Sequence, residues 1–393
     1  MALTLKEVIL LKQGEIVLKG LNRRVFESVL LNNIKRRLKQ YGNFNIYSMQ
    51  STVYVEPISP DTDNVEGAYK ACRAIFGIAT ISRAVECEKD KDAIVETAAA
   101  YLENHLNNVQ SFKVESKRAD KTFPLGSIEL SQYVGGLLQD RFPHLKAIMR
   151  SPDFTVFVEV RELAAYIHGP AETAAGGLPV GTGGSMVALL SGGIDSPVAM
   201  YMMAKRGVRL IPIHFFSPPY TSELAKEKVL NLAKLLSEYC GKLAVDIIPF
   251  TQISEEIRKK CPEALITIIM RRFMMRIAEQ IALNNGCSAI ITGDNLGQVA
   301  SQTIEALTVV EDCISLPILR PVIAFDKLEI TNISRGIGTY ETSILPYEDC
   351  CSIFTPRRPK TKPNIAEVLN AEAELEIDAL INYALEHKEE LRI

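Results

Sequence analysis

A chain of 393 residues is long enough for two or three domains. Hydrophobic residues make up 47% and charged residues 23%, which is the composition of an ordinary soluble globular protein. No apolar run approaches the roughly 20 residues that span a bilayer, and the N-terminus lacks a signal-peptide pattern, so we expect a cytoplasmic protein without membrane contacts. The formal net charge of −3 does not by itself indicate a nucleic-acid-binding protein. Residues 1–170 hold 22 Lys and Arg against 20 Asp and Glu, and the remainder holds 22 against 27, which weakly favours the N-terminal half for such contacts.

The first 168 residues alternate short strands with helices. Expected strands cover 8–11, 45–48, 52–57, 78–85, 112–116, 154–160 and 163–169, and expected helices cover 22–38, 65–74 and 93–105, with a further helix after Ser127. The first helix has a stripe of apolar residues at helical spacing, formed by Val25, Val29, Leu30, Ile34 and Leu38. We interpret this half as a small β-α-β-β-α-β unit that continues into a second α/β unit from about residue 60.

Residues 169–185 are rich in Gly, Pro and small side chains and form the clearest linker of the chain. Beyond it, apolar runs at 186–190, 210–216, 243–250 and 288–292 are typical of strands buried on both faces. Helices are expected at 195–206, 222–240, 263–285 and 298–308, and the last residues up to Ile393 are expected to be a plain helix. This alternation predicts an α/β domain with a doubly wound parallel sheet, which binds ligands at the carboxyl ends of its strands.

The strongest local signal is the sequence S-G-G-I-D-S between an expected strand and an expected helix. Gly192 and Gly193 allow the backbone to fold closely around an anion, and the helix presents its positive N-terminus to the same point. Ser191 and Ser196 add hydroxyl donors. Asp195 cannot bind phosphate directly, but it could hold a Mg²⁺ ion that bridges phosphates. The alternative is a simple glycine turn with a capping aspartate; no Lys-Ser/Thr pair at Walker spacing follows.

S-G-G-I-D-S resembles the PP-loop of the ATP pyrophosphatases, which cleave ATP between the α and β phosphates and leave AMP on the substrate. Three further stretches resemble the tRNA 4-thiouridine synthetase (tRNA sulfurtransferase, ThiI) family: I-H-F-F-S at 213–217, T-G-D-N-L-G-Q-V-A-S-Q-T at 292–303 and the tail E-D-C-C at 348–351. The resemblance covers essentially the whole chain and is to the short form without a rhodanese domain. It implies a ferredoxin-like domain at 1–60, an RNA-binding THUMP domain at 61–168, a linker at 169–185 and a PP-loop domain at 186–393.

The family resemblance implies that the enzyme adenylates uridine 8 of tRNA with ATP and Mg²⁺ and replaces its O4 with sulfur. It places the ATP contacts on Leu189, Leu190, His214, Phe215, Arg271, Gly293 and Gln302. We expect His214 to matter for its backbone position, and Arg271 either to offset phosphate charge or to lie on a solvated helix face. The family also places a functional lysine at Lys327, although this residue could simply belong to the cap of a helix that begins at Asp326.

The adjacent pair Cys350-Cys351 stands out among eight cysteines that include no C-x-x-C spacing, which argues against zinc ribbons and the commonest iron–sulfur sites. By resemblance Cys350 bears the persulfide, and Cys351 is the alternative carrier. Implied partners are tRNA, a cysteine desulfurase as persulfide donor and the sulfur carrier protein of thiazole synthesis; a homodimer is expected because two-fold dimers are common. The other cysteines are expected to pack in the core or at helix ends: Cys72, Cys87, Cys240, Cys261, Cys287 and Cys313.

Two basic stretches in the N-terminal half are candidates for RNA contact. Lys117, Arg118 and Lys121 precede Phe123, so that cations could meet phosphates while the ring stacks on a base. Arg23 and Arg24 lie at the start of a helix. Without the resemblance, solvated faces are the simpler interpretation of both stretches.

Two other functions fit parts of the sequence. Another adenylating tRNA modifier of the PP-loop type, such as an amidotransferase, would require a glutaminase domain or C-x-x-C pairs, and the sequence contains neither. A non-catalytic tRNA-binding protein could keep the nucleotide fold and would tolerate loss of Asp195 and Cys350.

Overall fold

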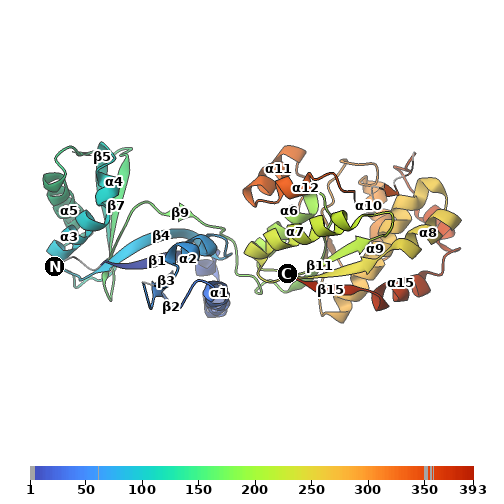
Figure 1. Ribbon diagram of the computed structural model, residues 1–393, viewed down its shortest axis with the longest axis horizontal. Coiled ribbons are helices and arrows are strands. Elements are labelled where there is room, and N and C mark those ends of the chain that lie inside the picture. Colours follow the sequence, from blue (N-terminus) through green and yellow to red (C-terminus); the bar gives the residue numbers. More distant parts are fainter. Residues whose placement is uncertain (1–4, 61, 349–352, 355, 357) are drawn as a thin grey trace. The chain divides into compact units, whose positions relative to one another are not determined.

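The computed structural model describes residues 5–60, 62–348, 353–354, 356 and 358–393. The chain divides into two compact units, Met1–Leu178 and Pro179–Ile393 (Figure 1). The division lies inside the glycine-rich stretch 169–185. This stretch is not a free linker. Residues 172–173 pair as a short strand with residues 80–81 of unit 1, and Gly181 and Gly183 donate their N–H groups to the carbonyl oxygen of Gly207 in unit 2.

Unit 1 is built on one nine-stranded sheet that runs through both expected N-terminal domains. Its strand order is β2-β3-β1-β4-β8-β7-β5-β6, with β9 paired to β4. The strands are β1 (Lys6–Gln13), β2 (Phe44–Met49), β3 (Thr52–Pro57), β4 (Ile78–Cys87), β5 (Ser111–Arg118), β6 (Lys146–Ala147), β7 (Phe154–Val160), β8 (Ala165–His168) and β9 (Glu172–Thr173). Strand β4 joins the two parts because it pairs with β1 on one side and with β8 on the other.

The helices of unit 1 form two separate hydrophobic cores on this sheet. They are α1 (Arg23–Leu38), α2 (Val65–Arg73), α3 (Lys91–Tyr101), α4 (Glu103–Leu106) and α5 (Ser127–Arg141). One core lies under α1 and α2, and the other lies between α3, α5 and the strands β5, β7 and β8. Two expectations need correction: the stripe on α1 omits Val25, which is 62% exposed in the first turn, and the helix at 93–105 breaks at Leu102.

Unit 2 has a six-stranded sheet with the order β14-β13-β10-β11-β12-β15. The strands are β10 (Ser185–Leu189), β11 (Arg209–Phe216), β12 (Ala244–Pro249), β13 (Ile290–Ile291), β14 (Ile318–Leu319) and β15 (Glu389–Arg392). The first five are parallel, as the apolar runs predict, and β15 pairs antiparallel with β12. The expectation of a plain helix up to Ile393 is therefore wrong, because the helix ends at Glu386 and residues Glu389–Arg392 form an edge strand.

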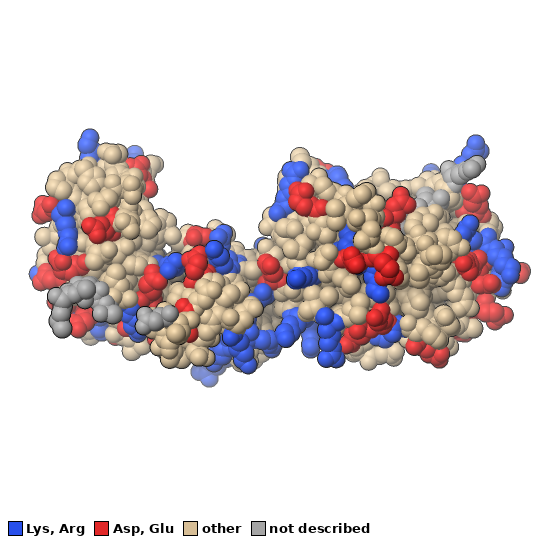
Figure 2. Space-filling view, in the orientation of Figure 1, with Lys and Arg blue, Asp and Glu red and all other residues tan. Residues whose placement is uncertain are grey.

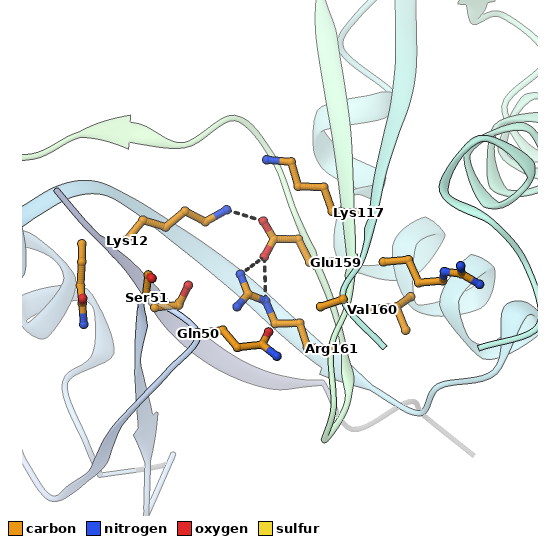
Figure 3. A pocket seen from close by; sticks show the side chains of 11 residues that line it. Lys12, Gln50, Ser51, Lys117, Glu159, Val160 and Arg161 are labelled. Atoms are coloured by element: carbon orange, nitrogen blue, oxygen red, sulfur yellow. Dashed lines mark hydrogen bonds and ion pairs between the residues drawn. The ribbon is translucent and has the colours of Figure 1, made fainter. Parts of the chain in front are cut away.

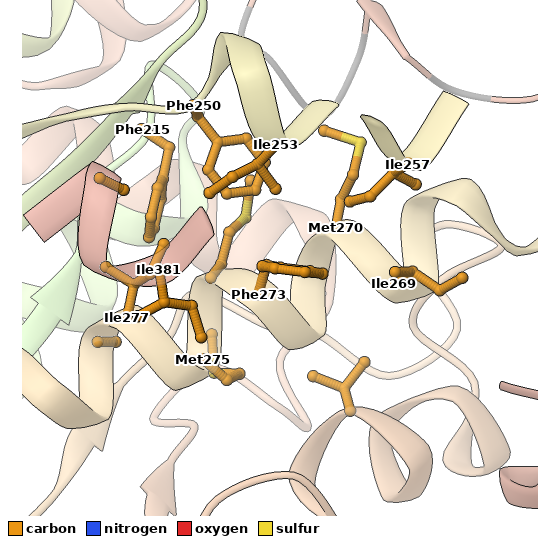
Figure 4. Packing of buried hydrophobic residues seen from close by; sticks show 14 of the residues in the cluster. Phe215, Phe250, Ile253, Ile257, Ile269, Met270, Phe273, Met275, Ile277 and Ile381 are labelled. Carbon is orange, nitrogen blue, oxygen red and sulfur yellow. The ribbon is translucent and has the colours of Figure 1, made fainter. Parts of the chain in front are cut away.

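The helices of unit 2 are α6 (Asp195–Lys205), α7 (Glu223–Cys240), α8 (Thr251–Lys260), α9 (Ile266–Asn284), α10 (Ile304–Glu311), α11 (Lys327–Gly336), α12 (Tyr340–Ser343), α14 (Ile365–Glu372) and α15 (Ile377–Glu386). Helix α9 lies at the centre of the core, where Phe273 and Ile277 pack against side chains of β11, α8 and α15 (Figure 4). The helix expected at 298–308 begins only at Ile304, because the Thr303 side chain accepts from the Ala306 N–H and caps it there.

Candidate active site

The phosphate loop lies between the end of β10 and the start of α6. Ser191 and Ser196 close it: the Ser191 N–H donates to Ser196 Oγ at 2.9 Å, and the two hydroxyl oxygens are 3.0 Å apart. The Gly193 N–H contacts Ser191 Oγ at 3.3 Å. Helix α6 begins at Asp195, so its unpaired N–H groups and positive end face the loop. This strand–loop–helix segment has the local structure of an anion site.

Gly293 follows β13 and lies directly against this loop. A Cβ atom there would come within 2.7 Å of the Ser196 nitrogen and 2.9 Å of the Asp195 carbonyl carbon. Both contacts are with backbone, so a larger residue would push the start of α6 away. The glycine is required for close packing between two carboxyl ends of neighbouring strands.

A cavity of about 400 Å³ opens at the carboxyl ends of β10, β11 and β13. Its remaining wall comes from α9 and from the segment before α10, and Pro359 adds a contact from the C-terminal part of the chain. Most of the expected nucleotide-binding residues line it: Leu189, Leu190, Ser191, Asp195, Ser196, His214, Phe215, Arg271, Gly293 and Gln302. Gly192 and Gly193 belong to the adjoining loop. The topological position is the one at which doubly wound sheets bind ligands.

His214 joins two of these strand ends. Its side chain is 4% exposed, and Nδ1 lies 3.0 Å from the carbonyl oxygen of Leu190. The ring therefore holds the end of β11 against the residue that opens the phosphate loop.

Asp195 and Lys327 meet at the mouth of the cavity. Lys327 Nζ lies 2.9 and 3.2 Å from the two carboxylate oxygens of Asp195, and the Gln298 amide donates to the same carboxylate at 3.0 Å. Lys327 is also the first residue of α11, whose N-cap is Asp326 with a reciprocal bond from Glu329. The lysine thus belongs to a capped helix start and reaches the phosphate loop as well.

Arg271 is held by a buried carboxylate that sequence reasoning missed. Its guanidinium donates to Asp294 Oδ1 at 2.6 Å and to the Ser301 carbonyl at 2.7 Å, so it is not on a solvated face. Arg320 lies 3.5 Å from the other Asp294 oxygen. Burial alone would raise the pKa of Asp294, but Arg271, the Thr292 hydroxyl and Arg320 outweigh it and hold the pKa below its ordinary value. The only signal in the sequence is the acidic residue directly after Gly293.

Cys350 and Cys351 lie outside the described residues. The other cysteines are packing residues, as expected, with Cys72, Cys240, Cys261 and Cys287 buried. Burial raises the pKa of the Cys72 thiol to about 12 and that of Cys261 to about 11, which leaves little thiolate at neutral pH.

The expected RNA-binding residues occupy different environments in unit 1. Lys117 and Arg118 line a second cavity of about 400 Å³ between β1, β3, β5 and β7, together with Lys12, Glu159 and Arg161 (Figure 3). Glu159 is 2% exposed at its floor and accepts bonds from Lys12 and Arg161. Lys117 is exposed and forms no ion pair with a described acidic residue, so this cavity offers cationic groups to an anion.

One expected RNA contact is wrong. Phe123 is 5% exposed and packs in the hydrophobic core of β5 and α5, so its ring is not available to stack on a base. Its carbonyl oxygen instead accepts from Arg118 Nη1 at 3.0 Å, which fixes the direction of that arginine. Lys121 and Arg24 are exposed, whereas Arg23 is bonded to Glu27 and Ser51. Figure 2 shows Lys and Arg gathered over α1.

Neither a metal-binding cluster nor a membrane-spanning helix occurs among the described residues. No group of three or more His, Cys, Asp or Glu side chains there could form a metal cage. No described helix is long and apolar enough to cross a bilayer.

Comparison with known proteins gives consistent family matches along the chain. The family model described as thiamine biosynthesis protein (ThiI) matches residues 181–377, the ThiI ferredoxin-like domain matches 8–82, and the THUMP domain matches 88–168. A probable tRNA sulfurtransferase of Acetivibrio thermocellus is 47% identical over 99% of both chains, and one of Caldanaerobacter subterraneus is 47% identical over 96% of this chain and 98% of its own.

Solved structures agree with these matches. A 4-thiouridine synthetase crystallised with RNA and bound ATP is 36% identical, with a TM-score of 0.91 over 99% of this chain and all of that one. PH1313 from Pyrococcus horikoshii is 25% identical, with a TM-score of 0.67 over 84% of this chain and 99% of its own. With a family model across half of the chain and full-length relatives near 47% identity, this chain belongs to the ThiI family of tRNA sulfurtransferases.

Proposed function

We propose that this chain uses ATP to adenylate O4 of uridine 8 in tRNA and replaces that oxygen with sulfur, giving 4-thiouridine. The proposal rests on the cavity beside the phosphate loop, called the nucleotide cavity below, with the Asp195–Lys327 pair at its mouth. The similar 4-thiouridine synthetase was crystallised with RNA and ATP, which supports both substrates.

The loop favours cleavage between the α and β phosphates because it holds the group that leaves. The positive N-terminus of α6 binds the β and γ phosphates and stabilises the departing pyrophosphate. Main-chain groups at 189–190 and 214–215 bracket the nucleoside at the two strand ends, and Gln302 can bond one of its polar edges. Lys327 stabilises negative charge that develops on the transferring phosphoryl group.

Magnesium fits this site through one carboxylate. Mg²⁺ is commonly held by one or two carboxylates together with phosphate oxygens and water, and Asp195 offers a carboxylate at the first residue of α6, directly after the loop. When bound, the ion would neutralise phosphate charge. Asp195 would then share its oxygens between the ion and Lys327, so its position depends on Lys327 and Gln298 even before ATP binds.

Sulfur transfer follows from the thiol chemistry of the tail. A cysteine desulfurase would load Cys350, or Cys351, with a persulfide. Its terminal sulfur forms a bond to C4 of the adenylated uridine, and AMP leaves with the electron pair of the C4–O bond. A second thiolate, from the neighbouring cysteine or from the thiol reductant, then attacks Sγ of the carrier, and the S–S bond breaks so that its electron pair stays on the sulfur at C4. The resulting disulfide takes two electrons from a thiol reductant.

The tRNA would bind unit 1 mainly through phosphate contacts. Lys117 and Arg118 in the second cavity, with Lys121 and Arg24, offer the charges that position an RNA backbone. Transfer of the same sulfur to the sulfur carrier protein of thiazole synthesis is a further proposal that comes from the family. A homodimer is proposed only because two-fold dimers are common.

The deciding experiment incubates the protein with unmodified tRNA, ATP, Mg²⁺, a cysteine desulfurase, cysteine and a thiol reductant, followed by nucleoside mass analysis. We expect one oxygen-to-sulfur exchange at uridine 8, with one AMP formed for each sulfur. Asp195→Ala should abolish AMP formation, whereas Cys350→Ser should keep tRNA-dependent pyrophosphate release and stop thiolation. Full thiolation by Cys350→Ser with none by Cys351→Ser would reverse the cysteine assignment, and full thiolation by both would exclude the persulfide scheme.

A further inference from the structure

Lys228 is a buried lysine that contacts the chain just before the cysteine pair. It lies in the second turn of α7 and is 5% exposed. Its Nζ donates to the carbonyl oxygen of Leu345 at 2.8 Å and lies 3.4 Å from that of Tyr347. A buried ammonium group requires hydrogen bonds in place of its lost water, and carbonyl oxygens provide them here. Lys228 therefore ties residues 345–347 to α7.

A second contact holds the chain just after the cysteine pair. Phe354 is 6% exposed, and its ring meets the Tyr220 ring edge-on with centroids 5.0 Å apart. The Arg258 guanidinium lies 5.5 Å from the Phe354 centroid and 5.9 Å from that of Tyr220, so one cation contacts both aromatic faces. The Tyr220 hydroxyl donates to Glu255 on the same helix as Arg258.

Both contacts lie at the edge of the sheet where the nucleotide cavity opens. Strand β11 ends at Phe216, Tyr220 follows shortly, and α7 begins at Glu223, so the early turns of α7 are next to that strand end. After Phe354 the chain continues to Pro359, which lines the cavity. Residues 345–347 and Phe354 are thus held by elements that adjoin the strand ends of the cavity, although neither Lys228 nor Tyr220 lines it.

We propose that Lys228 is a positioning residue for sulfur transfer, with the Phe354–Tyr220–Arg258 cluster as its counterpart on the other side of the cysteines. This inference rests on the proposed function. Cys350 follows Tyr347 by three residues and Cys351 precedes Phe354 by three, and three extended residues span at most about 11 Å. Only a short length of chain thus separates each cysteine from an anchored residue, and we expect the anchors to raise the effective concentration of the thiol at the activated uridine.

The test is Lys228→Met, which keeps the length and the apolar contacts of the side chain but removes its donors. We expect single-turnover sulfur transfer, from enzyme loaded with persulfide beforehand, to slow by about 10- to 100-fold. The burst of tRNA-dependent pyrophosphate release without a sulfur donor should stay within about twofold, because the cavity lining is unchanged. Peptides covering 340–348 should exchange amide hydrogen faster than in wild type.

Three controls make the result interpretable. Lys234→Met, on the exposed face of the same helix, should match wild type in every assay. Lys228→Arg retains donors and should recover most of the transfer rate, and Tyr220→Leu should slow transfer by releasing the second anchor. Equal loss of pyrophosphate release and sulfur transfer in Lys228→Met, or no loss of transfer, would overturn the inference. Absence of 4-thiouridine from wild-type reactions would instead reject the proposed function itself.

Discussion

Single buried carboxylates organise both cavities of this protein. In unit 2, Asp294 lies between Arg271 and Arg320 and fixes the direction of the arginine that enters the nucleotide cavity. In unit 1, Glu159 does the same for Lys12 and Arg161. A buried ion pair contributes little net stability compared with apolar packing, but loss of one partner leaves an uncompensated charge. These acids therefore hold cationic side chains in place at the walls of both cavities.

Asp294→Asn should weaken ATP binding and also destabilise unit 2. The amide cannot balance two guanidinium groups, so we expect a loss of about 3–5 kcal/mol in the free energy of unfolding and a raised KM for ATP. Urea unfolding and isothermal titration with ATP measure the two effects. Asp378→Asn, an exposed aspartate in the first turn of α15, is the matched control. Unchanged ATP affinity in Asp294→Asn would show that Arg271 is positioned by other contacts.

Glu159 should make the stability of unit 1 depend on pH in the acid range. Burial raises its pKa, but the His168 ring 3.6 Å away and the charges of Arg161 and Lys12 outweigh burial, so the folded pKa lies below the ordinary 4.5. A lowered pKa contributes stability above the unfolded value, and this contribution disappears as pH falls below 4.5 toward the folded pKa. Glu159→Gln should therefore be less stable than wild type at pH 7, and the difference should shrink below about pH 4.5. Denaturant unfolding across pH tests this, with exposed Glu115→Gln as control.

At the scale of elements, helix α14 is attached to the central helix α9 by one acid. Glu372 is 2% exposed and accepts four hydrogen bonds, two from Arg272 and two from Arg276, at 2.8–3.1 Å. Arg272 follows Arg271 on α9. Arg272 binds Glu372 of α14 on one face of the helix, and Arg271 lines the cavity on the adjacent face. The arrangement fixes the rotation of α9 about its axis.

Glu372→Gln should therefore loosen α14 and α15. Buried Arg272 and partly buried Arg276 would lose the carboxylate that they share, and we expect a loss of about 3–5 kcal/mol in the unfolding free energy of unit 2. Thermal unfolding and hydrogen exchange at 365–386 report this loss. Glu374→Gln, exposed two residues later, should behave as wild type. If Glu372→Gln unfolds like wild type, the arginines must find other acceptors.

For the whole molecule, the two units each have their own core. Separate hydrophobic clusters lie within residues 1–178 and within 179–393, and each sheet is complete inside its own unit. The cationic cavity belongs to the first unit and the nucleotide cavity to the second. The residues proposed to bind RNA and those proposed to bind ATP thus lie in separately packed parts.

Fragments 1–178 and 179–393 should consequently fold alone. We expect the first to bind tRNA with an affinity that ATP does not change, and the second to bind ATP without tRNA. Circular dichroism melting, filter binding and calorimetry measure these properties. In the first fragment, Lys117→Ala should reduce the slope of log affinity against log salt by about 0.7–0.9, the change for one phosphate contact. A fragment 1–178 without a cooperative melt would contradict this division.

The sequence alone determined the parts of this protein that are local in the chain. The phosphate loop spans six consecutive residues, and the parallel strands are short apolar runs, so neighbouring residues specify them directly. The start of α10 was misplaced because residues 299–302 form part of a cavity wall and Thr303 caps the helix, and helical spacing reveals neither.

Tertiary structure decided everything that joins distant residues. The bond from Arg271 to Asp294 crosses 23 positions and that from Lys12 to Glu159 crosses 147, and no periodicity links such pairs. From the sequence, the Phe123 ring was expected to stack on an RNA base. In the structure the ring is buried in the core of unit 1, because burial removes its apolar surface from water. The charged end of the chain, Glu389–Arg392, became a strand because the open edge of β12 offered hydrogen bonds to it. The residue types limit which reactions are possible, and tertiary packing determines which side chains come into contact.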